Sequence, residues 1–172
     1  MGLGTRWTWS CPLGVATWDS LEPDTVLGPA RLYYALPGAV GPLESDVEAV
    51  PPGTPSVAAL LSGVPEDEAD ESGVDGVTSP VFVERDRAGD VVAASGWVGW
   101  PGRTAHVCVL VATSTRGQGA AGRVGRAAVA HAGAAGVLTQ WRARPGPSSA
   151  VARRIGMTDV GAQLSLQAAR PA

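Results

Sequence analysis

The 172-residue chain contains no lysine and no asparagine, and all thirteen of its basic residues are arginine. The absence of lysine excludes a Schiff-base lysine and the phosphate-binding lysine of P-loop proteins. The two cysteines, Cys11 and Cys108, give no disulfide framework and no metal-ligand spacing, so we expect no metal. No apolar run is long enough to span a membrane, and the first residues lack the pattern of a signal peptide. These absences predict a cytoplasmic protein.

The charges are divided unequally between the two halves of the chain. Residues 1–86 hold fourteen of the sixteen acidic residues, whereas residues 87–172 hold ten of the thirteen arginines. One half is therefore expected to attract cations and the other anions. The alternative is a drift of surface charge that has no function.

The order of apolar periods and turn residues predicts a mixed α/β protein. Strands are also expected over 5–11 and 31–36, and the acidic run Glu66–Glu71 is expected to be a solvated loop or helix face. From residue 55 onward the pattern predicts a helix over 55–63, strands over 81–84, 91–97 and 105–112, a helix over 118–134, a strand over 137–142, a helix over 147–155 and a strand over 161–167.

The segment Val107–Gly122, VCVLVATSTRGQGAAG, is the most informative part of the sequence. An apolar strand passes through a polar turn into glycines and then into an alanine-rich helix. Small residues let a ligand approach the backbone, and the free N–H groups of a helix start attract an anion. The segment therefore predicts a phosphate cradle.

Two phosphate ligands fit this cradle to different degrees. Residues 117–122 match the dinucleotide pattern G-x-G-x-x-G. However, three residues separate the strand from the first glycine, and no acidic residue lies about 20 positions further on to bind a ribose. The alternative pattern, Arg116-x-x-Gly119-x-Ala121, resembles the Q/R-x-x-G-x-G/A motif that binds the pyrophosphate of acyl-coenzyme A in the GNAT superfamily of acetyltransferases.

The resemblance covers residues 78–168 and includes the order of elements, with 148–157 similar to the second conserved helix of the superfamily. It implies an α/β, GNAT-like acyl-CoA N-acyltransferase fold with a central mixed, mostly antiparallel sheet flanked by helices. Residues 1–172 are expected to form a single domain. Its acidic N-terminal half (1–76) diverges from the superfamily, and residues 77–172 form the acyl-CoA-binding core.

The resemblance also implies which residues bind acetyl-coenzyme A (acetyl-CoA). Strand amides would bind the pantetheine arm, and the cradle would bind the pyrophosphate. The implied residues are Val109, Leu110, Val111, Arg116, Gly117, Gln118, Gly119, Ala120, Ala121, Gly122 and Ser148.

The sequence departs from the superfamily where protons are transferred. The usual asparagine falls at Pro145, and the frequent tyrosine, which protonates the leaving thiolate, falls at Ala152. Candidate replacements are Tyr33, Tyr34, Ser148 and Ser149. For the general base we consider His106, whose neutral imidazole is a suitable proton acceptor near pH 7, and the rivals Glu68, Asp70 and Glu71. A structural histidine at the end of the strand is the alternative for His106.

These inferences predict an N-acetyltransferase that moves an acetyl group from acetyl-CoA to a primary amine by direct attack. The acidic run suggests a cationic acceptor, either a small molecule or a peptide, and the expected partners include a second copy of the chain but no nucleic acid and no membrane. Two alternatives stay open: a non-catalytic acyl-CoA sensor or interaction module, and a transferase that uses another acyl donor or a hydroxyl acceptor.

Overall fold

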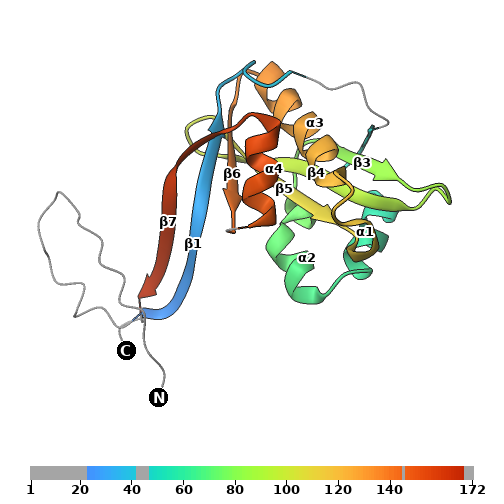
Figure 1. The fold of residues 1–172 in the computed structure, drawn as a ribbon, viewed down its shortest axis with the longest axis horizontal. Helices are drawn as coiled ribbons and strands as arrows, with labels where there is room; N and C mark the ends of the chain where they lie inside the picture. The colour runs from blue at the N-terminus through green and yellow to red at the C-terminus, as the bar shows by residue number, and fades with distance from the viewer. Residues whose placement is uncertain (1–22, 42–46, 145, 169–172) are drawn as a thin grey trace, which may run out of the picture. The chain divides into compact units, whose positions relative to one another are not determined.

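The computed structural model describes residues 23–41, 47–144 and 146–168 (Figure 1). Residues 29–163 form one compact unit, and residues 1–28 with 164–172 form another. Of this second unit, the structure describes only residues 23–28 and 164–168, which belong to two long strands.

Most predicted elements are confirmed within one to three residues, while the predicted strand over 5–11 lies outside the described residues. The acidic run forms a helix with no buried side chain, and one three-residue strand, too short for a periodic pattern, was not predicted. The elements are β1 (Pro23–Ala35), β2 (Glu48–Val50), α1 (Pro55–Ser62), α2 (Glu66–Ser72), β3 (Val81–Arg85), β4 (Val91–Trp100), β5 (Thr104–Val111), α3 (Ala120–Ala134), β6 (Leu138–Ala143), α4 (Pro147–Ile155) and β7 (Thr158–Ala168).

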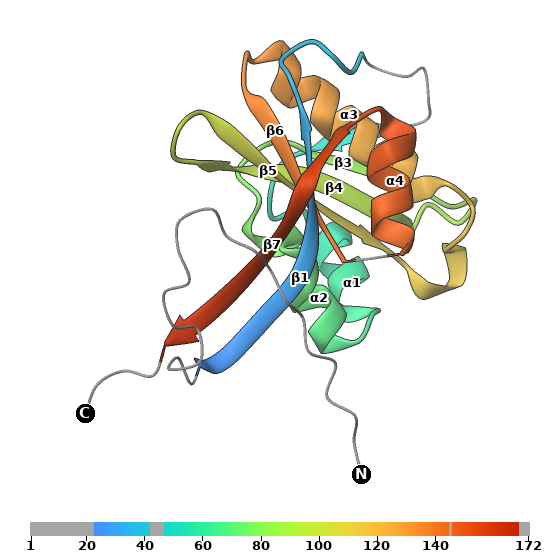
Figure 2. The ribbon, with the colours of Figure 1, turned by 60° about the vertical axis from the view of Figure 1, so that its left-hand side comes forward.

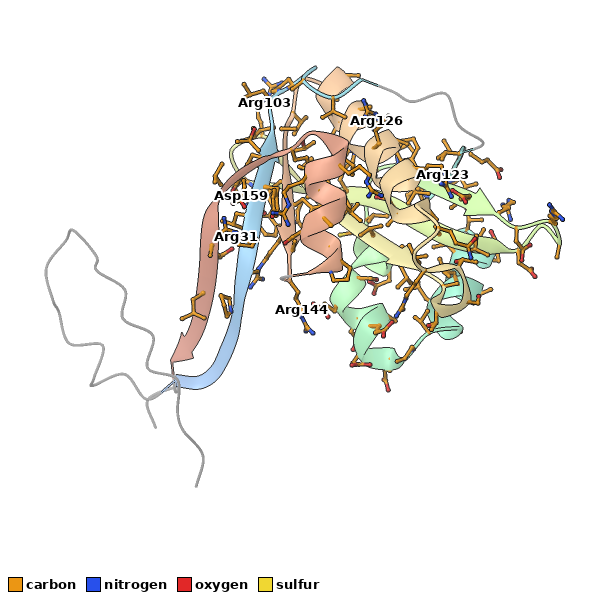
Figure 3. All side chains as sticks on the ribbon, in the orientation of Figure 1. Arg31, Arg103, Arg123, Arg126, Arg144 and Asp159 are labelled. Carbon is orange, nitrogen blue, oxygen red and sulfur yellow. The ribbon has the colours of Figure 1, made fainter. Side chains whose placement is uncertain are left out.

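The strands form one sheet in the order β2-β3-β4-β5-β6-β1-β7. Tight turns join β3 to β4 and β4 to β5, so these pairs are antiparallel. The β5–β6 pair is parallel because the long helix α3 connects the two strands. At the edge of the sheet formed by β1 and β7, Arg31 on β1 donates a hydrogen bond of 2.6 Å to Asp159 on β7 (Figure 3). The sheet is mixed and mostly antiparallel, as predicted.

Helices cover both faces of this sheet, and side-chain alternation along β5 shows how. Val107 packs in a core with α3 and α4, whereas Cys108 and Leu110 pack in a second core with α1. Both views show α3 beside α4 and α1 beside α2 (Figures 1 and 2). Because β5 carries core residues on each face, its backbone is fixed from both sides.

Replacing Gly125 with alanine is expected to destabilise the fold through its contact with β6. A Cβ at this position of α3 would lie 2.8 Å from the ring of Trp141, which is only 1% exposed. Overpacking of this kind costs about 1–3 kcal/mol, which exceeds the gain of up to ~1 kcal/mol in helix propensity. Urea denaturation should show the loss. Gly122→Ala on the same helix, where a Cβ meets nothing within 4 Å, is the control, and equal midpoints for the two variants would contradict the packing argument.

Candidate functional site

The two central parallel strands separate, and this opens the site. β5 pairs with β6 only over Thr104–His106, opposite Leu138–Gln140. β5 continues to Val111 and β6 to Ala143, but the structure shows no pairing between these later residues. The backbone groups of β5 that face the gap are therefore left without strand partners.

Strand alternation identifies which amides of β5 face this gap. The N–H of Ala112 donates to the carbonyl of Val92 at 2.8 Å, so the backbone groups two and four residues earlier also face β4. Leu110 therefore bonds toward β4, whereas the amides of Val109 and Val111 point into the gap. The resemblance implied that the amides of Val109, Leu110 and Val111 all bind the extended arm of the ligand. The amide of Leu110 cannot do so because it faces β4, although Leu110 does line the pocket.

The turn after β5 presents a row of unpaired N–H groups. Gly117 and Gly119 have φ angles of 79° and 84°, a left-handed conformation that favours glycine, and α3 begins at Ala120. Within the described ranges, no backbone or side-chain group accepts a hydrogen bond from the amides of residues 117–121. Five adjacent free donors at a helix start have the geometry that suits an anion.

The gap and the turn belong to one pocket with a volume of about 1210 Å³. Ten of the eleven residues implied for acetyl-CoA line this pocket, and so do His106, Glu68 and Glu71. The eleventh, Gln118, does not line it, and its backbone carbonyl accepts a hydrogen bond of 3.0 Å from Arg123. The other candidates for proton transfer, Tyr33, Tyr34, Asp70 and Ser149, also lie outside the pocket lining. The residues predicted from the sequence did not include Arg142 and Arg144, which also line the pocket. Arg142 alternates with Gln140 along β6, and Arg144 continues this alternation just after the strand ends, so the pattern could have indicated both.

The acidic helix α2 forms one wall of the pocket, and two of its three acidic residues on that wall are paired with arginines. Glu68 pairs with Arg116 of the cradle turn, and Glu71 pairs with Arg144, which follows β6 beside α2 (Figure 3). The hydrogen bonds from Arg116 lower the pKa of Glu68 below its usual value. A carboxylate held in its charged form is a weaker proton acceptor, so these pairs argue against Glu68 as the general base.

His106 is the last residue of β5 that pairs with β6. It belongs to a row of polar side chains that crosses three strands. Register places it opposite Gln140, which in turn lies opposite Tyr34 on β1. The Nδ1 atom of His106 is 3.2 Å from Oε1 of Gln140, and Nε2 of Gln140 donates to the Tyr34 hydroxyl. Since Oε1 can only accept, Nδ1 carries the proton and Nε2 of His106 is left with its lone pair.

The surroundings of His106 keep its imidazole neutral. Burial lowers the pKa of His106, and the positive charge of Arg142 lowers it further against the opposing effect of the Gln140 hydrogen bond. The indole of Trp100 stacks on the ring, with centroids 4.5 Å apart and planes inclined by 10°. A neutral, oriented imidazole on the pocket wall has the properties of a general base.

The start of α4 supplies a hydroxyl on the opposite side of the gap. Nε1 of Trp141 donates to Oγ of Ser148 at 3.0 Å, so the hydroxyl proton of Ser148 is left to donate elsewhere. Ala152, which stands where the superfamily often has its tyrosine, is 0% exposed in the core. A tyrosine would not fit at that position without repacking the core, so Ser148 is the better-placed donor.

Two other kinds of chemistry find no support in the described residues. Burial raises the pKa of the Cys108 thiol to about 11, with a further contribution from Asp75, so the thiolate needed for covalent catalysis is not formed near neutral pH. Residues 23–41, 47–144 and 146–168 contain no group of three or more His, Cys, Asp or Glu side chains arranged to hold a metal ion. None of the helices described is long and apolar enough to cross a membrane.

No protein-family model and no curated protein sequence matches the chain, so similarity is seen only among solved structures. A GNAT-family protein from Novosphingobium aromaticivorans superposes with a TM-score of 0.63 at 19% identity, covering 85% of this chain and 68% of its own. A GNAT-family acetyltransferase from Colwellia psychrerythraea has a TM-score of 0.59 at 20% identity, covering 86% of this chain and 58% of its own.

A GCN5-related N-acetyltransferase from Kribbella flavida has a TM-score of 0.60 at 17% identity, covering 81% of this chain and 57% of its own. The chain thus spans little more than half the length of two of these three structures. The fold is that of the GNAT acetyltransferases, as the motif around Arg116 and Gly119 predicted.

Proposed function

We propose that the chain is an N-acetyltransferase that transfers an acetyl group from acetyl-CoA to a primary amine. The observation that carries the proposal is the separation of β5 from β6, which leads directly into five unpaired amides at the start of α3. An extended thioester arm that ends in a pyrophosphate matches both parts. Gly119 supports the fit, because its φ of 84° turns the chain so that the helix start faces the pocket.

Particular groups of the chain would hold this substrate. The backbones of Val109 and Val111 would bond the pantetheine arm as a neighbouring strand does. The amides of residues 117–121 would bind the pyrophosphate, with the guanidinium of Arg116 adding a charge-assisted contact. Acetyl-CoA supplies an acyl group that is already activated as a thioester.

The proton movements are assigned to two side chains. Nε2 of His106 removes a proton from the ammonium form of the acceptor, either directly or through water. The amine nitrogen then bonds to the acetyl carbon while the carbon–sulfur bond breaks. The Ser148 hydroxyl gives its proton to the departing thiolate and takes up in exchange the proton that the nitrogen loses as it becomes an amide. Gln140 holds His106 in the tautomer that this role requires, which makes it a positioning residue.

Two assays test the proposal. Isothermal titration should show acetyl-CoA binding to the folded protein, and a thiol-release assay over a panel of amines should show turnover. Absence of acetyl-CoA binding would refute the assignment of the cradle. Binding without turnover on any acceptor would instead support a non-catalytic acyl-CoA sensor, the second candidate, which the buried Ala152 at the usual tyrosine position favours.

Glu68→Gln is expected to tighten acetyl-CoA binding by about two- to fivefold at low salt, because it releases Arg116 from its exposed ion pair. The gain should disappear near 1 M salt, where such charges are screened. Titration at both salt concentrations measures the effect. Glu48→Gln is the matched control, since it breaks the Arg85–Glu48 pair outside the pocket. A similar gain in the control, or a gain that persists in high salt, would contradict the explanation.

A further inference from the structure

Arg142 differs from the other arginines on the pocket wall. Its Nε atom is buried and has no hydrogen-bond partner. Within the described part of the chain, Arg116 and Arg144 are paired with Glu68 and Glu71. The remaining pocket arginines are also accounted for: Arg123 is paired with Glu84, Arg126 donates to two backbone carbonyls, and Arg154 is exposed on α4.

The position of Arg142 on β6 places its charge beside the reacting centre. It follows Gln140 by two residues, so the two side chains lie on the same face of β6, about 7 Å apart along the strand. Gln140 contacts His106, and the charge of Arg142 acts on the His106 imidazole. The strands begin to separate at this point, so Arg142 lines the pocket where the gap opens.

Among the residues that the structure describes, no acidic side chain pairs with the guanidinium of Arg142, and its positive charge would repel the ammonium group of a simple amine. A carboxylate close to that amine would satisfy the donors of Arg142 and remove the repulsion, because a guanidinium binds a carboxylate through two parallel hydrogen bonds. Among the acidic residues of α2 on the pocket wall, Glu68 and Glu71 are held by other arginines, and Asp67 forms no ion pair with Arg142 in the described residues. These pairs neutralise two of the three α2 carboxylates on the pocket wall, which weakens the basis for expecting a cationic acceptor.

We propose that Arg142 binds a carboxylate beside the reacting atoms, which makes it a residue that determines substrate specificity. This inference rests on the proposed acetyltransferase function. The carboxylate has two sources, an amine acceptor that carries one, such as an α-amino acid, or a dicarboxylic acyl donor, such as succinyl-CoA. Both sources share the chemistry that the site recognises, and the experiment separates them.

The experiment compares matched ligands on the wild-type protein, Arg142→Gln and Arg142→Lys. In the acceptor arm, kcat/KM is measured with acetyl-CoA for α-amino acids and for their carboxamides. In the donor arm, acetyl-CoA and succinyl-CoA are compared with an uncharged alkylamine. Independently of turnover, N-acetyl-amino acids and their amides are titrated into the protein with coenzyme A present. Arg87→Gln removes the same charge from an exposed turn outside the pocket and is the control.

In one of the two arms, the carboxylate form should be preferred by the wild-type protein. Arg142→Gln should reduce that preference about ten- to hundredfold and Arg142→Lys by less, because lysine keeps the charge without the bidentate geometry. Arg87→Gln should retain the preference. If neither arm nor the titration shows a preference that depends on Arg142, the inference is wrong while acetyl-CoA binding still stands. Loss of acetyl-CoA binding in the wild-type protein would instead overturn the proposed function.

Discussion

Gly119→Asp is expected to reduce acetyl-CoA affinity by at least about a hundredfold. An aspartate before the first residue of a helix accepts hydrogen bonds from the amides that follow it. Its carboxylate would therefore occupy the donors of the cradle and repel the pyrophosphate, a like-charge contact that costs several kcal/mol. Isothermal titration with acetyl-CoA measures the loss.

The fold should tolerate this substitution, so the result reports on binding. The φ of 84° strains an aspartate modestly, and the nearest atom to the new Cβ, at 3.0 Å, is the flexible end of Arg123. Gly89→Asp is a matched control, because this residue has a φ of 91° in the turn between β3 and β4, outside the pocket. Undiminished affinity in Gly119→Asp, or an equal loss in Gly89→Asp, would show that the cradle is misassigned.

His106→Ala is expected to lower kcat by about a hundred- to ten-thousandfold, the usual contribution of a general base. Acetyl-CoA affinity should hardly change. His106 lies where the gap between β5 and β6 begins, whereas the amides that would bind the pyrophosphate lie beyond the far end of β5. Steady-state kinetics and titration separate the two effects. His131→Gln is the control, since His131 bonds to Trp97 outside the pocket. An unchanged kcat in His106→Ala would assign the base elsewhere.

The pH profile gives a second test of the same residue. The base works when neutral, and the pKa of His106 is lowered from its ordinary value of 6.5 by burial and Arg142. Wild-type kcat/KM should therefore contain a limb that rises with pH and has its midpoint below 6.5. The acceptor amine adds its own limb at higher pH, which His106→Ala should retain while it loses the lower one. A lower limb that survives in His106→Ala would contradict the assignment.

Local patterns in the sequence were sufficient to predict the fold and the glycine-rich turn that we propose binds the acyl donor. The apolar run of β5, the glycines after Arg116 and the alanine-rich α3 are consecutive, so their chemistry can be read without knowledge of long-range contacts. Glycine is needed where φ is positive, and a helix start exposes its first amides, whatever the rest of the chain does. For this reason both the fold and the cradle followed from about ninety residues.

The acceptor half of the site was decided by tertiary structure. The row of His106, Gln140 and Tyr34 depends on the register of three strands that are distant in the sequence. The acidic run in the sequence suggested a site that attracts cations. In the folded chain, however, Glu68 and Glu71 pair with arginines that lie 48 and 73 residues further along the sequence. Within residues 23–41, 47–144 and 146–168, no ion pair neutralises Arg142, whose charge acts on His106. The charge that a substrate meets depends on which ions neutralise one another, and only the packing of α2 against the separated strands determines those pairs.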